Sequence, residues 1–281
     1  SDEGIDLLTR VFCRAGEDAI LHCPPTFGMY AIAARTQGAA IVSVPRMPDD
    51  GFRMDQAGII DALAKNTAIK LVFLTTPNNP TGDALEPDFL MRLLDLTAER
   101  ALIVVDEAYA EFCDFPSAST LIDRYENLVV LRTLSKAWAA AGLRCGTVLA
   151  QTSVISLLRR IIAPYPLASP VVSLACRMLD PALLNRQQQM LSAVQDNKER
   201  LLSILRKRPF IREIWPGEAN FVLLQTDNPD DLLSFCATRG IILRGYPADP
   251  VLNSCIRISV GSEEDLCALE SALDAWETQG E

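Results

Sequence analysis

The sequence contains a single histidine, His22, among 281 residues, and its eight cysteines include no CxxC pair. Metal sites made of histidine and cysteine need several such ligands close together, so we predict no metal site. Basic residues number 26 against 36 acidic ones, which gives a formal net charge of −10. This excess of negative charge excludes broad attraction to nucleic acid or to anionic lipid, and we predict neither partner.

Long apolar runs are also absent. The longest stretches without a charged side chain, Ala19–Ala34 and Ile161–Cys176, contain prolines. Both are shorter than the ~18 apolar residues that a membrane-spanning helix needs. We therefore expect a cytoplasmic protein with no membrane partner, whose cysteines are small buried thiols. The helical pattern begins at Ser1 itself, and we expect that the N-terminal part of the large domain is missing from this sequence.

Short apolar runs alternate with helical patterns over residues 1–170, which we assign to a large domain. Near-continuous Val, Ile and Leu runs separated by helices indicate a mostly parallel sheet covered on both faces, an α/β architecture. The predicted strands are Ala19–Cys23, Ala40–Val44, Leu71–Thr75, Leu102–Val105, Leu128–Leu131 and Thr147–Ala150.

The rest of the chain has a different character. Residues 171–208 form a polar, helical stretch that we interpret as a connecting helix. Residues 209–281 then resemble a small α+β C-terminal domain in their pattern. Its predicted strands are Phe221–Gln225, Ile241–Leu243 and Cys255–Val260, and its predicted helices are Asp230–Thr238 and Glu263–Glu277.

Polar residues follow three successive strands of the large domain. Open α/β sheets bind ligands beyond the carboxyl ends of their strands, so we expect these polar groups to face one crevice. The three segments are Pro77–Gly82, Asp106–Tyr109 and Thr133–Lys136.

Two charged residues stand out in these segments. Lys136, one of only five lysines, precedes the apolar segment Ala137–Ala141, a setting that favours the neutral, nucleophilic form of an amine. Asp106 follows four apolar residues, and a buried carboxylate needs a partner. That partner is a helix cap, an arginine, or the protonated nitrogen of a heterocyclic ligand.

A cluster of hydroxyl and cationic groups surrounds Lys136 in the sequence. Thr133 and Ser135 supply two hydroxyls, Arg144 supplies a guanidinium, and the helix that starts at Ser1–Asp2 supplies free backbone N–H groups. Hydroxyls, an arginine and a helix N-terminus together are typical of a phosphate site.

In order and spacing these segments, with Arg144, resemble the fold type I pyridoxal-phosphate enzymes, and within them the class II aminotransferases. Further segments, Cys23–Tyr30, Ala140–Gly146 and Ala163–Leu167, resemble the histidinol-phosphate aminotransferase family. The resemblance covers essentially the whole chain. It implies a large domain with the mostly parallel fold type I sheet, a small α+β C-terminal domain and a homodimer.

The resemblance also assigns a role to each matching residue. Lys136 would attach covalently to pyridoxal 5'-phosphate and move the substrate proton, and Asp106 would pair with the ring nitrogen. Tyr109 and Asn79 would bind the phenolic oxygen, and Phe27 would stack on the ring. The cofactor phosphate would be held by Ser1, Asp2, Thr133, Ser135 and Arg144.

Asn79 and two arginines of the small domain would bind substrate. Arg257 matches the family residue for the α-carboxylate, which suits a planar guanidinium, and Arg244 matches a position associated with the substrate phosphate. The implied reaction converts imidazole-acetol phosphate and L-glutamate to L-histidinol phosphate and 2-oxoglutarate, a step of histidine biosynthesis. Open alternatives are an aromatic aminotransferase, a threonine-phosphate decarboxylase, or a non-catalytic binding protein on the same fold.

Overall fold

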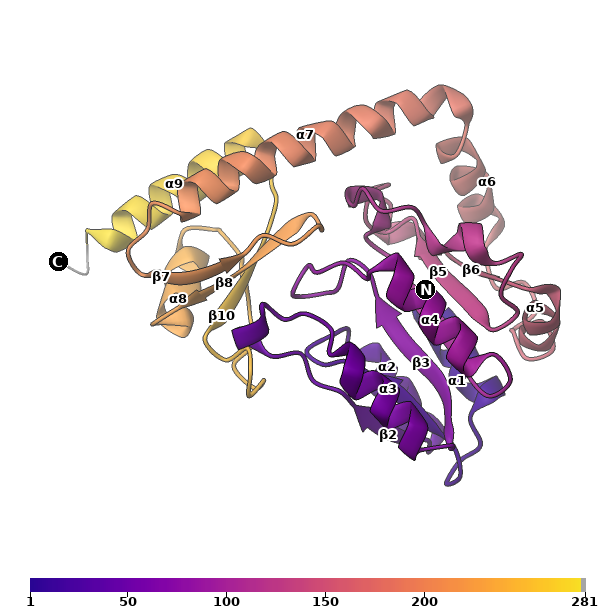
Figure 1. Ribbon diagram of the computed structural model, residues 1–281. Coiled ribbons are helices and arrows are strands. Elements are labelled where there is room, and N and C mark those ends of the chain that lie inside the picture. The colour runs from indigo at the N-terminus through magenta and orange to yellow at the C-terminus, as the bar shows by residue number, and fades with distance from the viewer. Residues whose placement is uncertain (279–281) are drawn as a thin grey trace.

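The computed structural model, which describes residues 1–278, contains a six-stranded sheet and a four-stranded sheet (Figure 1). The larger sheet has the order β2-β1-β3-β4-β5-β6. Its neighbouring strands are parallel except for β5 and β6, which confirms the mostly parallel arrangement. The strands are β1 (Ala19–His22), β2 (Ala40–Ser43), β3 (Ile69–Thr75), β4 (Leu102–Asp106), β5 (Leu128–Thr133) and β6 (Gly146–Ala150).

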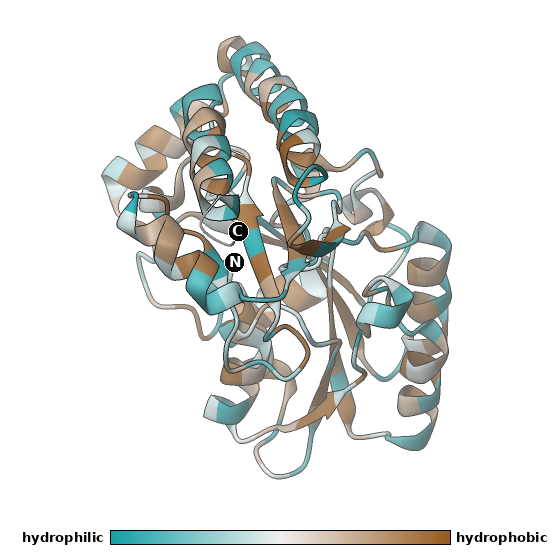
Figure 2. Ribbon diagram, turned by 90° about the vertical axis from the view of Figure 1, so that its left-hand side faces the viewer, coloured by the Kyte–Doolittle hydropathy of each residue, from teal (hydrophilic) through white to brown (hydrophobic). Residues whose placement is uncertain are grey.

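Helices cover both faces of this sheet, and Figure 2 shows its hydrophobic strands between them. One apolar core joins the sheet to α3 and α4, and a second joins the opposite face to α1, α2 and α5. Burial on both faces explains why the central strands are continuous apolar runs. The helices are α1 (Asp2–Phe12), α2 (Met29–Gln37), α3 (Gln56–Lys65), α4 (Pro87–Thr97) and α5 (Thr152–Leu158).

The predicted connecting helix is two helices, α6 (Ser169–Met178) and α7 (Pro181–Leu205). The single-helix prediction was wrong because Asp180 caps α7 by accepting a hydrogen bond from the N–H of Ala182, and Pro181 occupies the first helical position. Figure 1 shows α7 running from α6 to the smaller sheet. Neither α7 nor any other helix among residues 1–278 is long and apolar enough to cross a membrane.

The smaller sheet is antiparallel, with the order β7-β8-β10-β9. The sequence pattern missed β7, and the predicted strand Ile241–Leu243 was wrong. Ile242 is 82% exposed, and pairing with β10 begins only after Leu243. The elements are β7 (Ile211–Trp215), β8 (Phe221–Thr226), β9 (Arg244–Gly245), β10 (Cys255–Ser259), α8 (Pro229–Thr238) and α9 (Glu263–Glu277).

Strand β8 connects the two parts of the molecule. Its alternate side chains Val222 and Leu224 pack against α7, α8 and α9, as the two-residue period of a strand requires. Phe221 on the opposite face packs against Tyr109 of the large sheet's loops, with ring centroids 5.2 Å apart. The backbone N–H of Glu218 also donates to the carbonyl of Gly82 at 2.7 Å. The small sheet is thereby held against the loops that follow β3 and β4.

Candidate active site

A cavity of about 660 Å³ lies at the carboxyl end of the large sheet. Thr75, Asp106 and Thr133 are the last residues of β3, β4 and β5, and all three line it. The strand register places Thr75 beside Asp106. The predicted convergence of polar strand ends is therefore confirmed. Other predicted residues that line the cavity are Ser1, Asp2, Phe27, Asn79, Tyr109, Ser135, Lys136 and Arg144.

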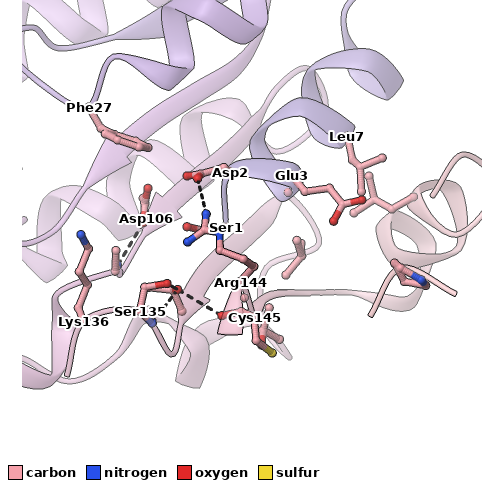
Figure 3. A pocket seen from close by; sticks show the side chains of 18 of the residues that line it. Ser1, Asp2, Glu3, Leu7, Phe27, Asp106, Ser135, Lys136, Arg144 and Cys145 are labelled. Atoms are coloured by element: carbon pink, nitrogen blue, oxygen red, sulfur yellow. Dashed lines mark hydrogen bonds and ion pairs between the residues drawn. The ribbon is translucent and has the colours of Figure 1, made fainter. Parts of the chain in front are cut away.

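Lys136 presents its amine to this cavity (Figure 3). Its Nζ lies 5.1 Å from the centroid of the Tyr109 ring, which gives it a cation–π contact. The prediction of an apolar setting was wrong, because the side chain is exposed. Of the apolar residues that follow Lys136, Ala137 and Ala140 are buried and do not cover its amine. An exposed amine on a cavity wall is accessible to a ligand.

Asp106 lies at the floor of the cavity and is only 2% exposed. Its Oδ2 accepts a hydrogen bond from the Tyr30 hydroxyl at 2.8 Å, and its Oδ1 accepts one from the N–H of Ala108 at 3.1 Å. Burial raises the pKa of this carboxyl, and the two hydrogen bonds partly oppose that rise. Because each oxygen accepts only one of these bonds, the carboxylate can accept a further N–H from a ligand.

Hydroxyl and cationic groups gather at one side of the cavity. The Thr133 hydroxyl lies 2.9 Å from Ser135 Oγ, and Arg144 ends the short turn before β6. Arg144 pairs with Asp2 at 3.2 Å (Figure 3). Gly146 lets α1 begin here, because a Cβ at this position would lie 2.2 Å from the backbone nitrogen of Ser1.

The remaining predicted cofactor contacts surround the same space. Phe27 meets the Tyr30 ring edge-on at 5.8 Å, and Tyr109 is 5% exposed. Asn79 follows β3 in the segment Pro77–Gly82. This segment is held by the ion pair between the buried Arg46 and Asp83 and by the hydrogen bond from Thr81 to Asp83. These contacts fix a loop that would otherwise be free to move.

The two predicted substrate arginines occupy different positions. Arg257 on β10 donates from Nη1 to Asn79 Oδ1 at 2.6 Å and lies 4.9 Å from the Phe221 ring. Asn79 lines the cavity, whereas Arg257 is not among its described lining residues. Arg244 is exposed on β9 directly opposite Arg257, and its guanidinium lies 5.8 Å from the Tyr246 ring. Arg257 thus reaches the predicted site through its hydrogen bond to Asn79. Arg244 lies beside Arg257 on the neighbouring strand of the small sheet.

Sequence reasoning missed three contributors to this site: Tyr30, Thr75 and Gly146. Tyr30 lies in a helix that packs on the sheet, and a buried tyrosine hydroxyl usually has a hydrogen-bond partner. That requirement was the available signal. Thr75 is the last residue of β3, a strand whose end was already predicted to face the ligand site. Nothing in the local sequence distinguishes Gly146.

The donor set fits pyridoxal phosphate. An accessible amine, a buried carboxylate with free lone pairs, and hydroxyl, guanidinium and N–H donors line one cavity. The volume of about 660 Å³ is also within the usual range for small-molecule sites. These groups match an aldehyde, a ring nitrogen and a phosphate on a single planar ligand.

Comparisons with known proteins agree with this geometry. The model of the family "Aminotransferase class I and II" matches residues 1–273. Histidinol-phosphate aminotransferase of Escherichia coli (strain K12) is 40% identical over 98% of this chain and 76% of its own length. A histidine biosynthesis bifunctional protein of Photorhabdus laumondii is 39% identical over the whole chain, which spans only 34% of that relative.

Solved structures share the fold. Histidinol-phosphate aminotransferase of Sinorhizobium meliloti, solved in complex with pyridoxal-5'-phosphate, superposes with a TM-score of 0.88 at 23% identity. The match covers all of this chain and 75% of that one. The architecture is therefore that of fold type I. With its sheet, its polar strand ends and a family match over residues 1–273, this chain belongs to the class I and II aminotransferases.

Proposed function

We propose that this chain forms the pyridoxal-phosphate site of a histidinol-phosphate aminotransferase. In this reaction L-glutamate gives its amino group to imidazole-acetol phosphate, and the products are 2-oxoglutarate and L-histidinol phosphate. The family membership and the 40% identity to the Escherichia coli enzyme support this assignment.

One observation carries the proposal: Lys136 and Asp106 line the same cavity from the ends of the neighbouring strands β5 and β4. An amine able to bind an aldehyde and a buried carboxylate able to hold a ring N–H are the two groups that this chemistry needs. A binding protein without catalytic activity needs neither of them.

When bound, pyridoxal phosphate supplies an electron sink that stabilises negative charge at the substrate Cα. Lys136 Nζ would hold the aldehyde carbon of the bound cofactor, and once the substrate amine has displaced it, the freed amine would accept the proton from the substrate Cα and return it to the ligand. Asp106 accepts the ring N–H and keeps it protonated. Its burial strengthens this charge pairing, because the dielectric constant is low there.

Other residues of the chain bind and orient the ligand. Ser135, Thr133, Arg144 and the N–H groups at Ser1–Asp2 hold the cofactor phosphate, a use of hydroxyls and a helix N-terminus that suits an anion. Phe27 stacks on the ring. Asn79 and Tyr109 hold the phenolic oxygen.

Two arginines select the substrates. Arg257, which donates a hydrogen bond to the cavity residue Asn79, binds the α-carboxylate of glutamate through its planar guanidinium. Arg244, on the neighbouring strand, binds the phosphate of the imidazole substrate. Cationic groups gathered locally in this region explain how a chain of net charge −10 accepts anionic substrates.

The test combines spectroscopy and turnover. Pyridoxal phosphate added to the protein should give a protein-bound absorption band, and borohydride reduction followed by peptide mapping should place the adduct on Lys136. The Lys136→Ala variant should lose both the adduct and turnover. An adduct on another lysine, or an unchanged band in Lys136→Ala, would refute the assignment.

Substrate choice needs a second assay. We expect glutamate alone to give at most one equivalent of 2-oxoglutarate per site, and repeated turnover only when imidazole-acetol phosphate is present. Greater activity with an aromatic keto acid would identify an aromatic aminotransferase instead. Release of carbon dioxide from threonine phosphate would identify a decarboxylase.

We also propose that the protein is a cytoplasmic homodimer. Six large apolar side chains between residues 172 and 190 are each 39–49% exposed, and such a concentration is typical of an interface. Free thiols at all eight cysteines agree with a reducing compartment. Light scattering after gel filtration should give twice the 30.8 kDa chain mass, and a monomeric mass would refute the dimer. The exposed apolar residues are Val172, Leu174, Leu179, Leu183, Leu184 and Met190.

A further inference from the structure

Tyr30 lies beneath the cavity and is completely buried. Its ring stacks on Phe73, with centroids 4.7 Å apart and an interplanar angle of 10°, and meets Phe27 edge-on. Its hydroxyl is 2.8 Å from Asp106 Oδ2 and 2.7 Å from Thr75 Oγ1. A single side chain thus contacts both the ring-stacking residue and the carboxylate of the proposed site.

The protons in this network can have only one arrangement when Asp106 is ionised. A carboxylate only accepts, so Tyr30 gives its one proton to Asp106. Thr75 must then donate to the Tyr30 oxygen. The Thr26 hydroxyl also lies 3.2 Å from Thr75 Oγ1. Its own proton goes to Asn78 Oδ1 at 2.7 Å, so the Thr75 proton remains available for the Tyr30 oxygen. The donors are therefore aligned from Thr75 through Tyr30 to Asp106.

This donor is permanent. Burial, and next the nearby Asp106 charge, raise the pKa of Tyr30 well above its usual value, so the hydroxyl keeps its proton at any physiological pH. The other charged side chain that influences Asp106 is Asp2, at the start of α1. Only Tyr30 contacts the carboxylate of Asp106 through a side-chain hydrogen bond among residues 1–278.

We propose that Tyr30 is a positioning residue for the cofactor, whose hydroxyl keeps Asp106 ionised and fixed in the orientation that pairs with the protonated ring nitrogen. This inference rests on the proposed pyridoxal-phosphate function. Tyr30 acts through Asp106, because its own hydroxyl has both of its partners inside the protein. Thr75 supports it by orienting that hydroxyl.

The test removes the hydroxyl alone. Tyr30→Phe keeps the ring that stacks on Phe73, and Thr75→Val removes the donor behind Tyr30 while nearly preserving the shape of the side chain. The matched control is Tyr125→Phe: Tyr125 is also buried, at 7% exposure, but its hydroxyl has no hydrogen-bond partner in the described part of the chain.

Two measurements separate positioning from a loss of packing. Equilibrium dialysis gives the dissociation constant of pyridoxal phosphate for each variant. The ¹⁵N chemical shift of pyridoxal phosphate labelled at the ring nitrogen, followed against pH, reports whether that nitrogen is protonated when bound. A role in packing alone would leave the second measurement unchanged.

A hydrogen bond to a charged group corresponds to about a 10- to 100-fold effect. We therefore expect Tyr30→Phe to weaken cofactor binding by about that factor and to lower the pH at which the ring nitrogen loses its proton by about 1–2 units. Thr75→Val should shift both quantities in the same direction by less, and it carries the test if Tyr30→Phe does not fold. Tyr125→Phe should match the unchanged protein.

Two results would overturn the inference. If the unchanged protein binds pyridoxal phosphate normally and Tyr30→Phe behaves like Tyr125→Phe in both measurements, the role of Tyr30 is refuted while the proposed function stands. If the unchanged protein binds no pyridoxal phosphate, the proposed function fails and this inference fails with it.

Discussion

A buried ion-pair network beneath the active site offers a sharp test of what stabilises the fold. Glu107, the residue after Asp106, is 2% exposed and accepts three hydrogen bonds: from Ser117 Oγ at 2.6 Å, from the N–H of Ala118 at 2.6 Å and from Arg132 Nη1 at 2.8 Å. Arg132 also binds Glu111 at 2.8 Å. One guanidinium therefore pairs with two carboxylates.

We predict that Arg132→Met lowers the free energy of unfolding by about 2–4 kcal/mol. Removing one member of a buried ion pair typically costs about 3–5 kcal/mol, because the remaining charge is left without a partner. The expected loss is smaller here, since Arg132 is 27% exposed and Glu107 keeps two other donors.

Urea unfolding followed by circular dichroism at neutral pH measures this loss. The control is Arg212→Met, which removes an ion pair to Asp227 between two exposed side chains, where a much smaller change is expected. Double replacement of Arg132 by Met and Glu107 by Gln should recover part of the lost stability, because no uncompensated charge remains at Glu107. If Arg132→Met and Arg212→Met lose equal stability, burial does not determine the strength of these pairs and the reasoning is refuted.

Two further predictions concern pH and backbone conformation. Hydrogen bonds from Arg14 hold the pKa of Asp18 below its usual 3.8. The unchanged protein should therefore be more stable than Asp18→Asn at pH 7, and this difference should be lost as the pH falls through the lowered pKa. Equal differences in urea midpoint between the two proteins at pH 7 and at pH 3 would contradict this. Gly82→Ala should cost about 2–4 kcal/mol in urea unfolding, because φ is +79° and a Cβ would lie 2.8 Å from Gly217 Cα. Gly51→Ala, at φ +62° with open space around its Cβ, is the control and should lose clearly less; an equal loss would exclude the close contact as the cause.

Local sequence patterns determined most of the secondary structure. Apolar runs of four to seven residues became the central strands β1, β3, β4 and β5 of the large sheet, since both faces of the sheet are buried there. The prediction of α9 as Glu263–Glu277 was confirmed residue for residue, where Ser262 and Asp265 form a capping box. Failures occurred in the small sheet, at two strands that are half-exposed and carry no continuous apolar run: β7 was missed, and β9 begins three residues later than the predicted strand.

The polar residues at the ends of β3, β4 and β5 were also determined by the sequence, because parallel strands bring their carboxyl ends to one edge. Tertiary structure alone decided their partners. Asp106 is bound by Tyr30, 76 residues away, and Asn79 by Arg257, 178 residues away. The exposure of Lys136 was likewise set by the cavity in front of it rather than by its apolar neighbours. Strand ends follow from hydrophobic period and local backbone preference, whereas hydrogen-bond partners and burial depend on which distant segments the packed core brings together.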